Sequence, residues 1–343
     1  MKWYESRNTR NDVFAAARIR LVRNLEGVPF PDKLTEEETE GLNRLLQDRL
    51  SDMTTSSGKQ FRYFELNDLT EVERMALKER RVINETLATK TTPTGLLVLD
   101  DESMSVSMNG DDHIRIQCMS TDVNLDRIWT GCDQIDDYIN RRFTYAYHEK
   151  YGYLTTFPTN MGTGLRVSVY LHLPFLSSGK QFRNLIGEVS RFGVRVKGVF
   201  GEGAENYGSL YEVSNQKTLG QSEEEILSLV YRMASHLAAN ERRVRAMALR
   251  DKRVVLEDEA YKSYGVLKYA RHLSLKEAMI YLSHVRVGLC EGMLQTEQPV
   301  NIFGYMLNQQ DANIKARRIG DVSEEELNQI RAESIRDSLP NLV

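Results

Sequence analysis

Cations alternate with apolar residues in four short segments of the sequence, within residues 18–21, 113–118, 165–173 and 194–197. Residues two apart in a strand share a face, so each segment predicts an amphipathic strand with its polar row opposite a core. The polar rows are Arg18 and Arg20; His113, Arg115 and Gln117; Arg166, Ser168, Tyr170 and His172; and Arg195 and Lys197.

If these strands share one sheet, five or six cations converge on one surface. Their mutual repulsion is costly unless an anion normally lies there, and guanidinium forks match phosphate oxygens. The pattern therefore predicts a polyphosphate site. For any single strand, a solvated arginine is the commoner outcome; it is the four strands together that favour a site.

Carboxylates lie close to the same segments. Asn109-Gly110-Asp111-Asp112 is a turn pattern between two predicted strands, and Glu202 follows Lys197 in a glycine-rich loop. A carboxylate beside a phosphate site can bind a cationic acceptor and accept its proton. Taken alone, each of these residues is equally explained by turn chemistry or by a solvated loop charge.

Other phosphate-binding and catalytic signatures are missing from the sequence. It contains no GxxxxGK[ST], no HRD or DFG pair, no GxGxxG, and neither HExxH nor GxSxG. Nucleotide binding would therefore depend on arginines over a sheet.

The elements that position these residues follow from the apolar patterns. Strands are expected at 94–100, 103–109, 113–119, 165–173 and 194–200, and helices at 35–50, 69–88, 122–142 and 180–192. This order predicts an α+β fold with a largely antiparallel sheet flanked by helices.

The end of the chain has a different character. A capping box at Ser222 opens a helix to about residue 250, and further helices are expected at 255–270, 274–284 and 323–337. We predict a catalytic domain at residues 1–252 and a smaller all-helical domain at residues 253–343.

Composition limits the class of protein. The 343 residues are 41% apolar and 27% charged, with a net charge of −4, so no overall basic footprint for nucleic acid exists. No apolar run has membrane-spanning length and the start lacks a signal-peptide core, which predicts a cytoplasmic protein with no membrane partner. Three widely spaced cysteines favour buried thiols rather than disulfides or a metal site.

Four segments resemble the motifs of the ATP:guanido phosphotransferases, the creatine and arginine kinase superfamily. Residues 153–166 (YLTTFPTNMGTGLR) resemble the family signature, and 109–116 (NGDDHIRI) resemble NEEDHxRI. Residues 18–24 (RIRLVRN) resemble SSRIRLARN, and 197–202 (KGVFGE) resemble RGxxGE. The short stretch before Arg18 and the helical tail with YGVLK at 264–268 look like the bacterial protein-arginine kinases of the McsB type.

The resemblance implies transfer of the γ-phosphoryl group of Mg-ATP to arginine side chains of proteins. It also implies a C-terminal helical domain used in dimerisation and substrate docking. The implied partners are an activator protein, a repressor of a stress regulon and a Clp protease that receives the marked proteins.

Matched residue by residue, Arg18, Arg20, Arg115 and Arg166 resemble family arginines that hold ATP phosphates. Glu202 resembles a catalytic glutamate, and Asp111 stands where a second one is expected. The nucleotide site is completed by the segments around these residues: Ile19, Val167, Ser168, Val169, Tyr170, Lys197, Gly198, Val199, Phe200 and Gly201.

Three departures from the family pattern fall in this site. Asp111 is one methylene shorter than glutamate, Lys197 replaces a fifth arginine, and Phe157 replaces an active-site cysteine. In the C-terminal RDxxRA motif, which the family uses to bind phosphoarginine, only Arg331-Ala332 remains. Two hypotheses follow: an active protein-arginine kinase, slower than its relatives, or a catalytically impaired pseudokinase that binds nucleotide and regulates a partner.

Overall fold

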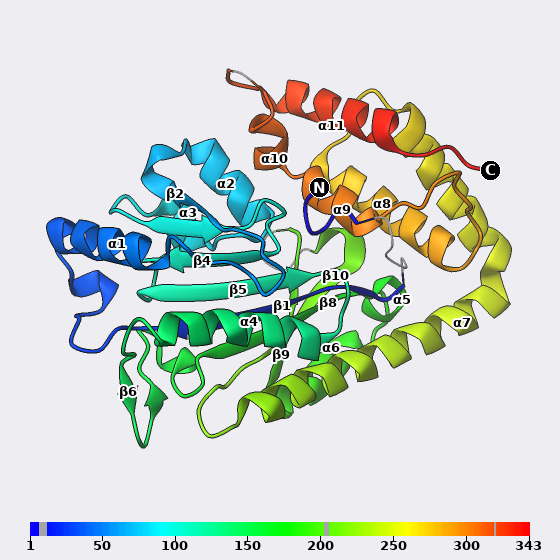
Figure 1. The fold of residues 1–343 in the computed structure, drawn as a ribbon. Helices are drawn as coiled ribbons and strands as arrows, with labels where there is room; N and C mark the ends of the chain where they lie inside the picture. Colours follow the sequence, from blue (N-terminus) through cyan, green and yellow to red (C-terminus); the bar gives the residue numbers. More distant parts are fainter. Residues whose placement is uncertain (7–11, 202–205, 319) are drawn as a thin grey trace.

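The computed structural model describes residues 1–6, 12–201, 206–318 and 320–343. Within them, an antiparallel eight-stranded sheet is flanked by helices (Figure 1), which confirms the α+β prediction. The strand order is β2-β3-β4-β5-β1-β8-β10-β9. These strands are β1 (Phe14–Arg23), β2 (Arg62–Glu65), β3 (Gly95–Val98), β4 (Met104–Met108), β5 (Ile114–Ser120), β8 (Leu165–His172), β9 (Val194–Gly198) and β10 (Leu210–Asn215). A separate small hairpin pairs β6 (Tyr147–His148) with β7 (Gly152–Tyr153).

Helices begin where the capping patterns predict. Each of these helices begins with a capping box, in which the hydroxyl of the first residue accepts a hydrogen bond from the backbone N–H three residues on. The glutamate at that later position accepts one from the backbone N–H of the capping residue. The capping residues are Thr35, Ser222, Ser274 and Ser323. The helices are α1 (Glu36–Leu50), α2 (Glu71–Glu79), α3 (Glu85–Thr89), α4 (Leu125–Asn140), α5 (Pro174–Ser177), α6 (Phe182–Arg191), α7 (Glu223–Tyr269), α8 (Leu275–Cys290), α9 (Ile302–Asn308), α10 (Asp311–Lys315) and α11 (Glu324–Ser338).

Two expectations about the elements of the sheet domain were wrong. The helix expected over 69–88 is two helices, because Arg81 adopts a left-handed backbone conformation (φ 68°) between α2 and α3. The patterns also missed β2 and β10. As a result β10 separates β8 from β9 in the sheet.

The helix α7 spans the predicted domain division and is kinked there. Its 47 residues form two helical segments that meet at a kink, in agreement with the helices predicted to about residue 250 and over 255–270. Its regular geometry is interrupted at Lys252 (φ −141°, ψ 31°). The division at 252/253 stays a prediction. In the described part of the chain, none of the helices is long and apolar enough to cross a membrane.

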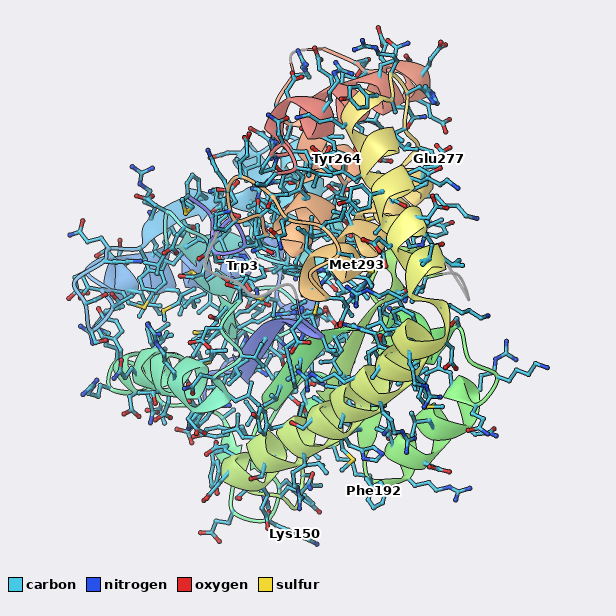
Figure 2. The ribbon with its side chains drawn as sticks, turned by 90° about the vertical axis from the view of Figure 1, so that its right-hand side faces the viewer. Trp3, Lys150, Phe192, Tyr264, Glu277 and Met293 are labelled. Carbon is cyan, nitrogen blue, oxygen red and sulfur yellow. The ribbon has the colours of Figure 1, made fainter. Side chains whose placement is uncertain are left out.

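Two large apolar cores lie on either side of the sheet. The first packs one sheet face, with Ile19, Val167 and Val169, against α1, α4 and α7. The second joins the C-terminal helices to the N-terminal segment, and both Trp3 and Tyr264 belong to it (Figure 2). The Trp3 ring lies 5.9 Å from the Phe303 ring, centre to centre. The segment is fixed there by Asn301, whose Nδ2 donates to the Tyr4 carbonyl at 2.7 Å. The first residues of the chain therefore pack against its C-terminal helices.

The three cysteines are free thiols. Cys118 and Cys132 are buried in the first core, as expected, whereas Cys290 is partly exposed at the end of α8.

Candidate active site

The four arginines predicted to bind phosphate lie on one face of the sheet. Arg20 on β1 is the direct cross-strand partner of Arg166 on β8, and of Gln117, two residues from Arg115, on β5. Directly paired residues of an antiparallel sheet point to the same side. We call the surface formed by Arg18, Arg20, Arg115 and Arg166 the cationic face. The geometric expectation that distant arginines gather on one surface is thereby confirmed.

Arg20 lies at the centre of the cationic face without a partner. Its guanidinium makes no hydrogen bond or ion pair with any described residue, and its Nε is buried. Burial, with repulsion from Arg115, Arg18 and Arg166, holds the pKa of Arg20 well below its ordinary value. A half-buried cation among like charges is stable only if an anion joins it, so the geometry fits phosphate binding.

Arg18 is paired by a carboxylate that the sequence reasoning missed. Its Nη2 donates to Glu212 Oε1 at 2.7 Å, and the Ser168 hydroxyl donates to the same oxygen at 2.6 Å. Burial lowers the pKa of Arg18, but Tyr170 and Glu212 outweigh it and the pKa is raised. Burial raises the pKa of Glu212, but Arg18, the Ser168 hydrogen bond and two further arginines lower it to about 2. Glu212 is therefore charged and belongs to the site.

Arg115 and Arg166 flank Arg20 on the neighbouring strands. Arg115 lies 3.9 Å from Asp111 Oδ2, and burial with repulsion from Arg18 lowers its pKa to about 10. Arg166 is held from one side, since its Nη1 donates to the Asn215 carbonyl and its Nη2 to Asn160 Oδ1 at 3.3 Å. Burial lowers the pKa of Arg166 as well. Both side chains keep donors available for a ligand.

The two aspartates of the β4–β5 hairpin have different surroundings. Asp111 is one-fifth exposed at the edge of the cationic face, where its Oδ2 accepts from Asn84 Nδ2 at 2.8 Å. Asp112 is buried, and its Oδ1 accepts from Asn24 Nδ2 and the Thr156 N–H, both at 2.7 Å. Asp111 is therefore placed to meet a ligand, and Asp112 ties three segments of the fold together.

The predicted phosphate-binding segment at the end of β9 lies at the far side of the face. Lys197 is exposed and is the cross-strand partner of Glu212, on the same side of the sheet. Gly198 ends the strand, the Val199 N–H donates to Leu210, and Phe200 is buried in the second core. Gly201 is exposed with φ 108°, and Glu202, the first candidate for catalysis, lies outside the described residues.

Three residues assigned to the nucleotide site by their place in the sequence point away from it. The side chains of Ile19, Val167 and Val169 are fully buried in the first core, because they alternate with the arginines. Their side chains therefore do not reach the cationic face. Ser168 and Tyr170 do lie on that face, where Arg18 approaches the Tyr170 ring at 5.9 Å.

The histidines expected in the polar rows are buried structural residues, which corrects that expectation. His113 Nδ1 accepts from the Leu25 N–H at 3.0 Å, and its Nε2 lies 2.8 Å from the Pro29 carbonyl. His172 Nε2 lies 2.7 Å from Ser283 Oγ of α8. Helix α8 therefore covers one end of the polar row of β8.

Arg81 is a further cation of the site that no sequence signal indicated. Its Nη2 donates to the Val199 carbonyl at 3.1 Å, and its own carbonyl accepts from Gln117 Nε2. It is close enough to help lower the pKa of Glu212. Its left-handed backbone conformation turns the chain at the end of α2 and brings the side chain to the cationic face.

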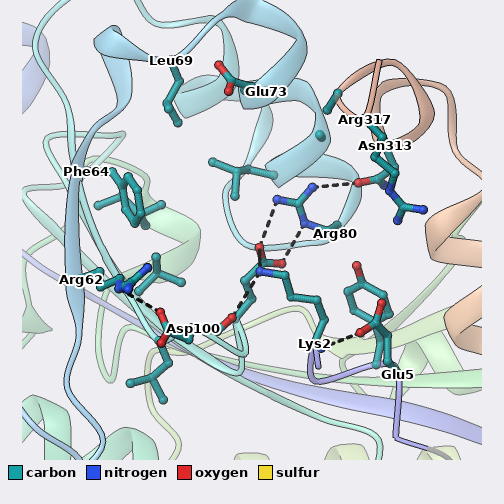
Figure 3. Close-up of a pocket in the computed structure, with 18 of the residues that line it drawn as sticks. Lys2, Glu5, Arg62, Phe64, Leu69, Glu73, Arg80, Asp100, Asn313 and Arg317 are labelled. Carbon is teal, nitrogen blue, oxygen red and sulfur yellow. Dashed lines mark hydrogen bonds and ion pairs between the residues drawn. The ribbon is translucent and has the colours of Figure 1, made fainter. Parts of the chain in front are cut away.

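A cavity of about 680 Å³ lies elsewhere, between the N-terminal segment, α2 and α10 (Figure 3). Its wall includes Phe64, Leu69 and Asn313. Arg80 crosses it, donating to both carboxylate oxygens of Glu102 and to Asn313 Oδ1 (Figure 3). Several of its charged groups pair with one another, namely Lys2 and Arg80 with Glu102 and Arg62 with Asp100. It contains none of the predicted site residues. We therefore place the active site on the cationic face.

Comparison with known families agrees with this geometry. A model of the ATP:guanido phosphotransferase C-terminal catalytic domain matches residues 42–244, more than half of the chain. The chain belongs to the ATP:guanido phosphotransferase family. A model of the protein-arginine kinase McsB C-terminal domain matches residues 253–343.

Similar family members are named protein-arginine kinase. The one from Caldanaerobacter subterraneus is 38% identical over 318 residues, covering 89% of this chain and 94% of the relative. The one from Bacillus subtilis is 36% identical over 293 residues, covering 85% of this chain and 80% of the relative. The predicted family resemblance is therefore confirmed, and the chain is a guanido phosphotransferase enzyme.

Solved structures of family members share the fold. The duplicated taurocyamine kinase from Schistosoma mansoni matches with a TM-score of 0.59 at 24% identity, over 68% of this chain and 34% of that one. Lombricine kinase matches with a TM-score of 0.59 at 22% identity, over 68% of this chain and 67% of that one. These likenesses concern the fold of the catalytic sheet.

Two of the three departures from the family pattern, Asp111 and Phe157, lie on neighbouring segments. Phe157 is half exposed, and its carbonyl accepts from Thr155 Oγ1 at 2.8 Å. The neighbouring Thr156 hydroxyl donates to the Asp111 carbonyl at 2.7 Å. The segment with Phe157 therefore supports the hairpin that carries Asp111.

Arg331, the remnant of the C-terminal family motif, is fully engaged inside the helical region. It is 1% exposed, and its donors bond the Gln309 and Leu273 carbonyls, Asn328 Oδ1 and Asp311 Oδ1. Asn328, which stands where the family motif has aspartate, is one of these partners. Arg331 therefore connects α11 to α10 and to the start of α8.

Proposed function

We propose that this enzyme is a protein-arginine kinase, which transfers the γ-phosphoryl group of ATP to arginine side chains of proteins. The observation that carries the proposal is the cationic face, with Arg20 unpaired between Arg115 and Arg166. The names of its relatives support the choice of protein arginine as acceptor.

In the proposed reaction, an acceptor guanidinium nitrogen attacks the γ-phosphorus of ATP in line with the leaving oxygen. A nitrogen–phosphorus bond forms as the bond from phosphorus to the ADP oxygen breaks. Such transfer needs positioning and charge stabilisation more than covalent help from the protein. Arg18, Arg20, Arg115 and Arg166 would supply the charge, and Lys197 and Arg81 extend it at one side.

The acceptor must also lose a proton. A guanidinium is protonated below about pH 12, so a carboxylate has to bind it and accept the proton as nitrogen attacks. We assign this role first to Glu202, on its family motif, and second to Asp111, which lies at the edge of the face beside Arg115. The exposure of Asp111 supports access by a protein substrate.

Magnesium would enter as part of the ATP complex. The described residues contain no group of three or more His, Cys, Asp or Glu side chains suited to a metal ion. The donor set of the face is cationic, so it fits the phosphates rather than the metal. The metal would neutralise phosphate charge, and the chain's own residues hold and orient the triphosphate.

The test is a transfer assay with radiolabelled ATP and an arginine-rich protein. We expect acid-labile label on the protein, because phosphoarginine has a labile nitrogen–phosphorus bond, and we expect Glu202→Gln to abolish it. Label that survives acid, or that is unchanged in Glu202→Gln, would contradict the proposal.

A pseudokinase that binds ATP and regulates a partner is the second candidate. It is favoured by Asp111, which is one methylene short of glutamate and already hydrogen-bonded to Asn84. ATP binding without transfer in the same assay would support it.

For the kinase, we further propose a cytoplasmic homodimer that acts with an activator protein and marks proteins for a Clp protease in the stress response.

A further inference from the structure

Glu212 is the carboxylate that occupies the cationic face. It lies on β10 as the cross-strand partner of Tyr170 and Lys197. Among the described residues, it is the one carboxylate that hydrogen-bonds to an arginine of this face, accepting from Arg18 at 2.7 Å. Its side chain is one-fifth exposed, so it lies where a ligand of the face would lie.

The charge around Glu212 is strongly unbalanced. Arg18, Arg20 and Arg81 all act on it electrostatically, and Arg20 is in turn repelled by Arg115 and Arg166. The Glu212 carboxylate acts against this repulsion at Arg20. Its presence lowers the repulsion that the empty face would otherwise suffer.

An incoming triphosphate would satisfy the same arginines. Its oxygens carry negative charge into the space beside Arg18, where the Glu212 carboxylate is held by two hydrogen bonds. Like charges at close range repel more strongly in a half-buried site than in water. The carboxylate that stabilises the empty face must then oppose the bound nucleotide.

We propose that Glu212 is an internal counter-ion of the cationic face, which stabilises the nucleotide-free enzyme and limits its affinity for ATP. The inference rests on the proposed ATP-dependent function. It assigns Glu212 no contact with the reacting atoms, so it is a positioning residue that acts through Arg18.

The experiment compares the wild type with Glu212→Gln, which keeps the shape and the acceptor for Arg18 but removes the charge. Binding of ATP is measured by calorimetry, and thermal unfolding without nucleotide gives the melting temperature. We expect the Kd for ATP to fall about tenfold, as one like charge is removed. We expect the melting temperature to fall by about 2–4 °C.

Glu241→Gln is the matched control. Glu241 is a fully buried carboxylate on α7, paired with Arg245 at 3.1 Å, and it lies outside the cationic face. Its substitution should lower the melting temperature and leave the Kd for ATP unchanged. The control separates loss of a buried ion pair from loss of charge at the nucleotide site.

Opposite outcomes decide the inference. An unchanged or raised Kd for ATP in Glu212→Gln overturns it, and a raised Kd would make Glu212 a contributor to binding instead. If Glu212→Gln does not fold, Glu212→Asp replaces it: the shorter carboxylate withdraws from Arg18, and a Kd about threefold below wild type is expected. A Kd at or above wild type in Glu212→Asp overturns the inference. Failure of both wild type and variant to bind ATP overturns the proposed function itself, and this inference with it.

Discussion

Arg20 and Arg23 lie three residues apart on β1 and on opposite faces of the sheet, and their surroundings differ completely. Arg23 is 1% exposed and donates to Asp136 Oδ2 at 2.6 Å and to the Thr163 carbonyl at 2.8 Å. It also lies 3.7 Å from the centre of the Tyr153 ring. Arg20 has no such partner among the described residues. A buried arginine with a full set of partners serves the fold, whereas an unpaired one among like charges serves a ligand.

The largest expected effect comes from Arg20→Met. Removing a cation that stabilises phosphate charge should lower kcat/KM by about 10³–10⁵-fold, the range seen for arginines at phosphoryl-transfer sites. Because Arg20 has no partner to lose, the melting temperature should stay the same or rise. The measurements are steady-state phosphorylation and thermal unfolding. A kcat/KM within tenfold of wild type would contradict the assignment of Arg20 to ligand binding.

Arg23→Met should give the reverse pattern. It leaves Asp136 buried with its ion pair removed, which should lower the free energy of unfolding by about 3–5 kcal/mol. The enzyme that remains folded should keep its Kd for ATP. Urea unfolding and calorimetry measure both quantities, and the double variant with Asp136→Leu should recover part of the lost stability. A wild-type unfolding curve would contradict the structural role of Arg23.

The same contrast applies on a smaller scale to Asp111 and Asp112. Asp111→Glu should raise kcat by up to about a hundredfold, because a displacement of about 1 Å at a reacting centre costs about that much. Asp112→Glu is the control, since lengthening a buried side chain that bonds Asn24 and Thr156 should lower stability without a gain in rate. A rate unchanged in Asp111→Glu would remove Asp111 from the acceptor site.

The smallest effect concerns the pH dependence of stability. The folded pKa of Glu212, about 2, lies below the unfolded value, so its contribution is complete above about pH 4.5 and is lost as pH falls toward 2. Wild type should therefore lose on the order of 1–2 kcal/mol more than Glu212→Gln between pH 5 and pH 3. Urea unfolding at the two pH values measures this. An equal loss of unfolding free energy in wild type and Glu212→Gln would contradict the ion pair between Glu212 and Arg18.

Local patterns predicted the strands of the cationic face because alternation alone fixes which residues share a side. They predicted Arg18, Arg20, Arg115 and Arg166 together for that reason. They could not place Glu212, since β10 was not recognised and its pairing with β8 joins residues 44 apart. Arg81 gave no signal either, because a left-handed arginine has no local sequence mark.

His113 shows how long-range contacts override a polar pattern. It follows the period of Arg115 and Gln117, yet its ring bonds Leu25 and Pro29, more than 80 residues earlier in the chain. By contrast, the helix break predicted near residue 250 is present as the kink of α7 at Lys252. The roles of Glu202 and of the C-terminal region as a docking domain stay predictions.

The union of the first residues with α9 has a consequence for biosynthesis. Trp3 and Tyr4 leave the ribosome about 300 residues before Phe303, the aromatic ring beside Trp3. At 5–20 residues per second, they wait roughly 15–60 s for that neighbour. During that interval Trp3 lacks its neighbour Phe303, so the second core closes only after the C-terminal helices have been made.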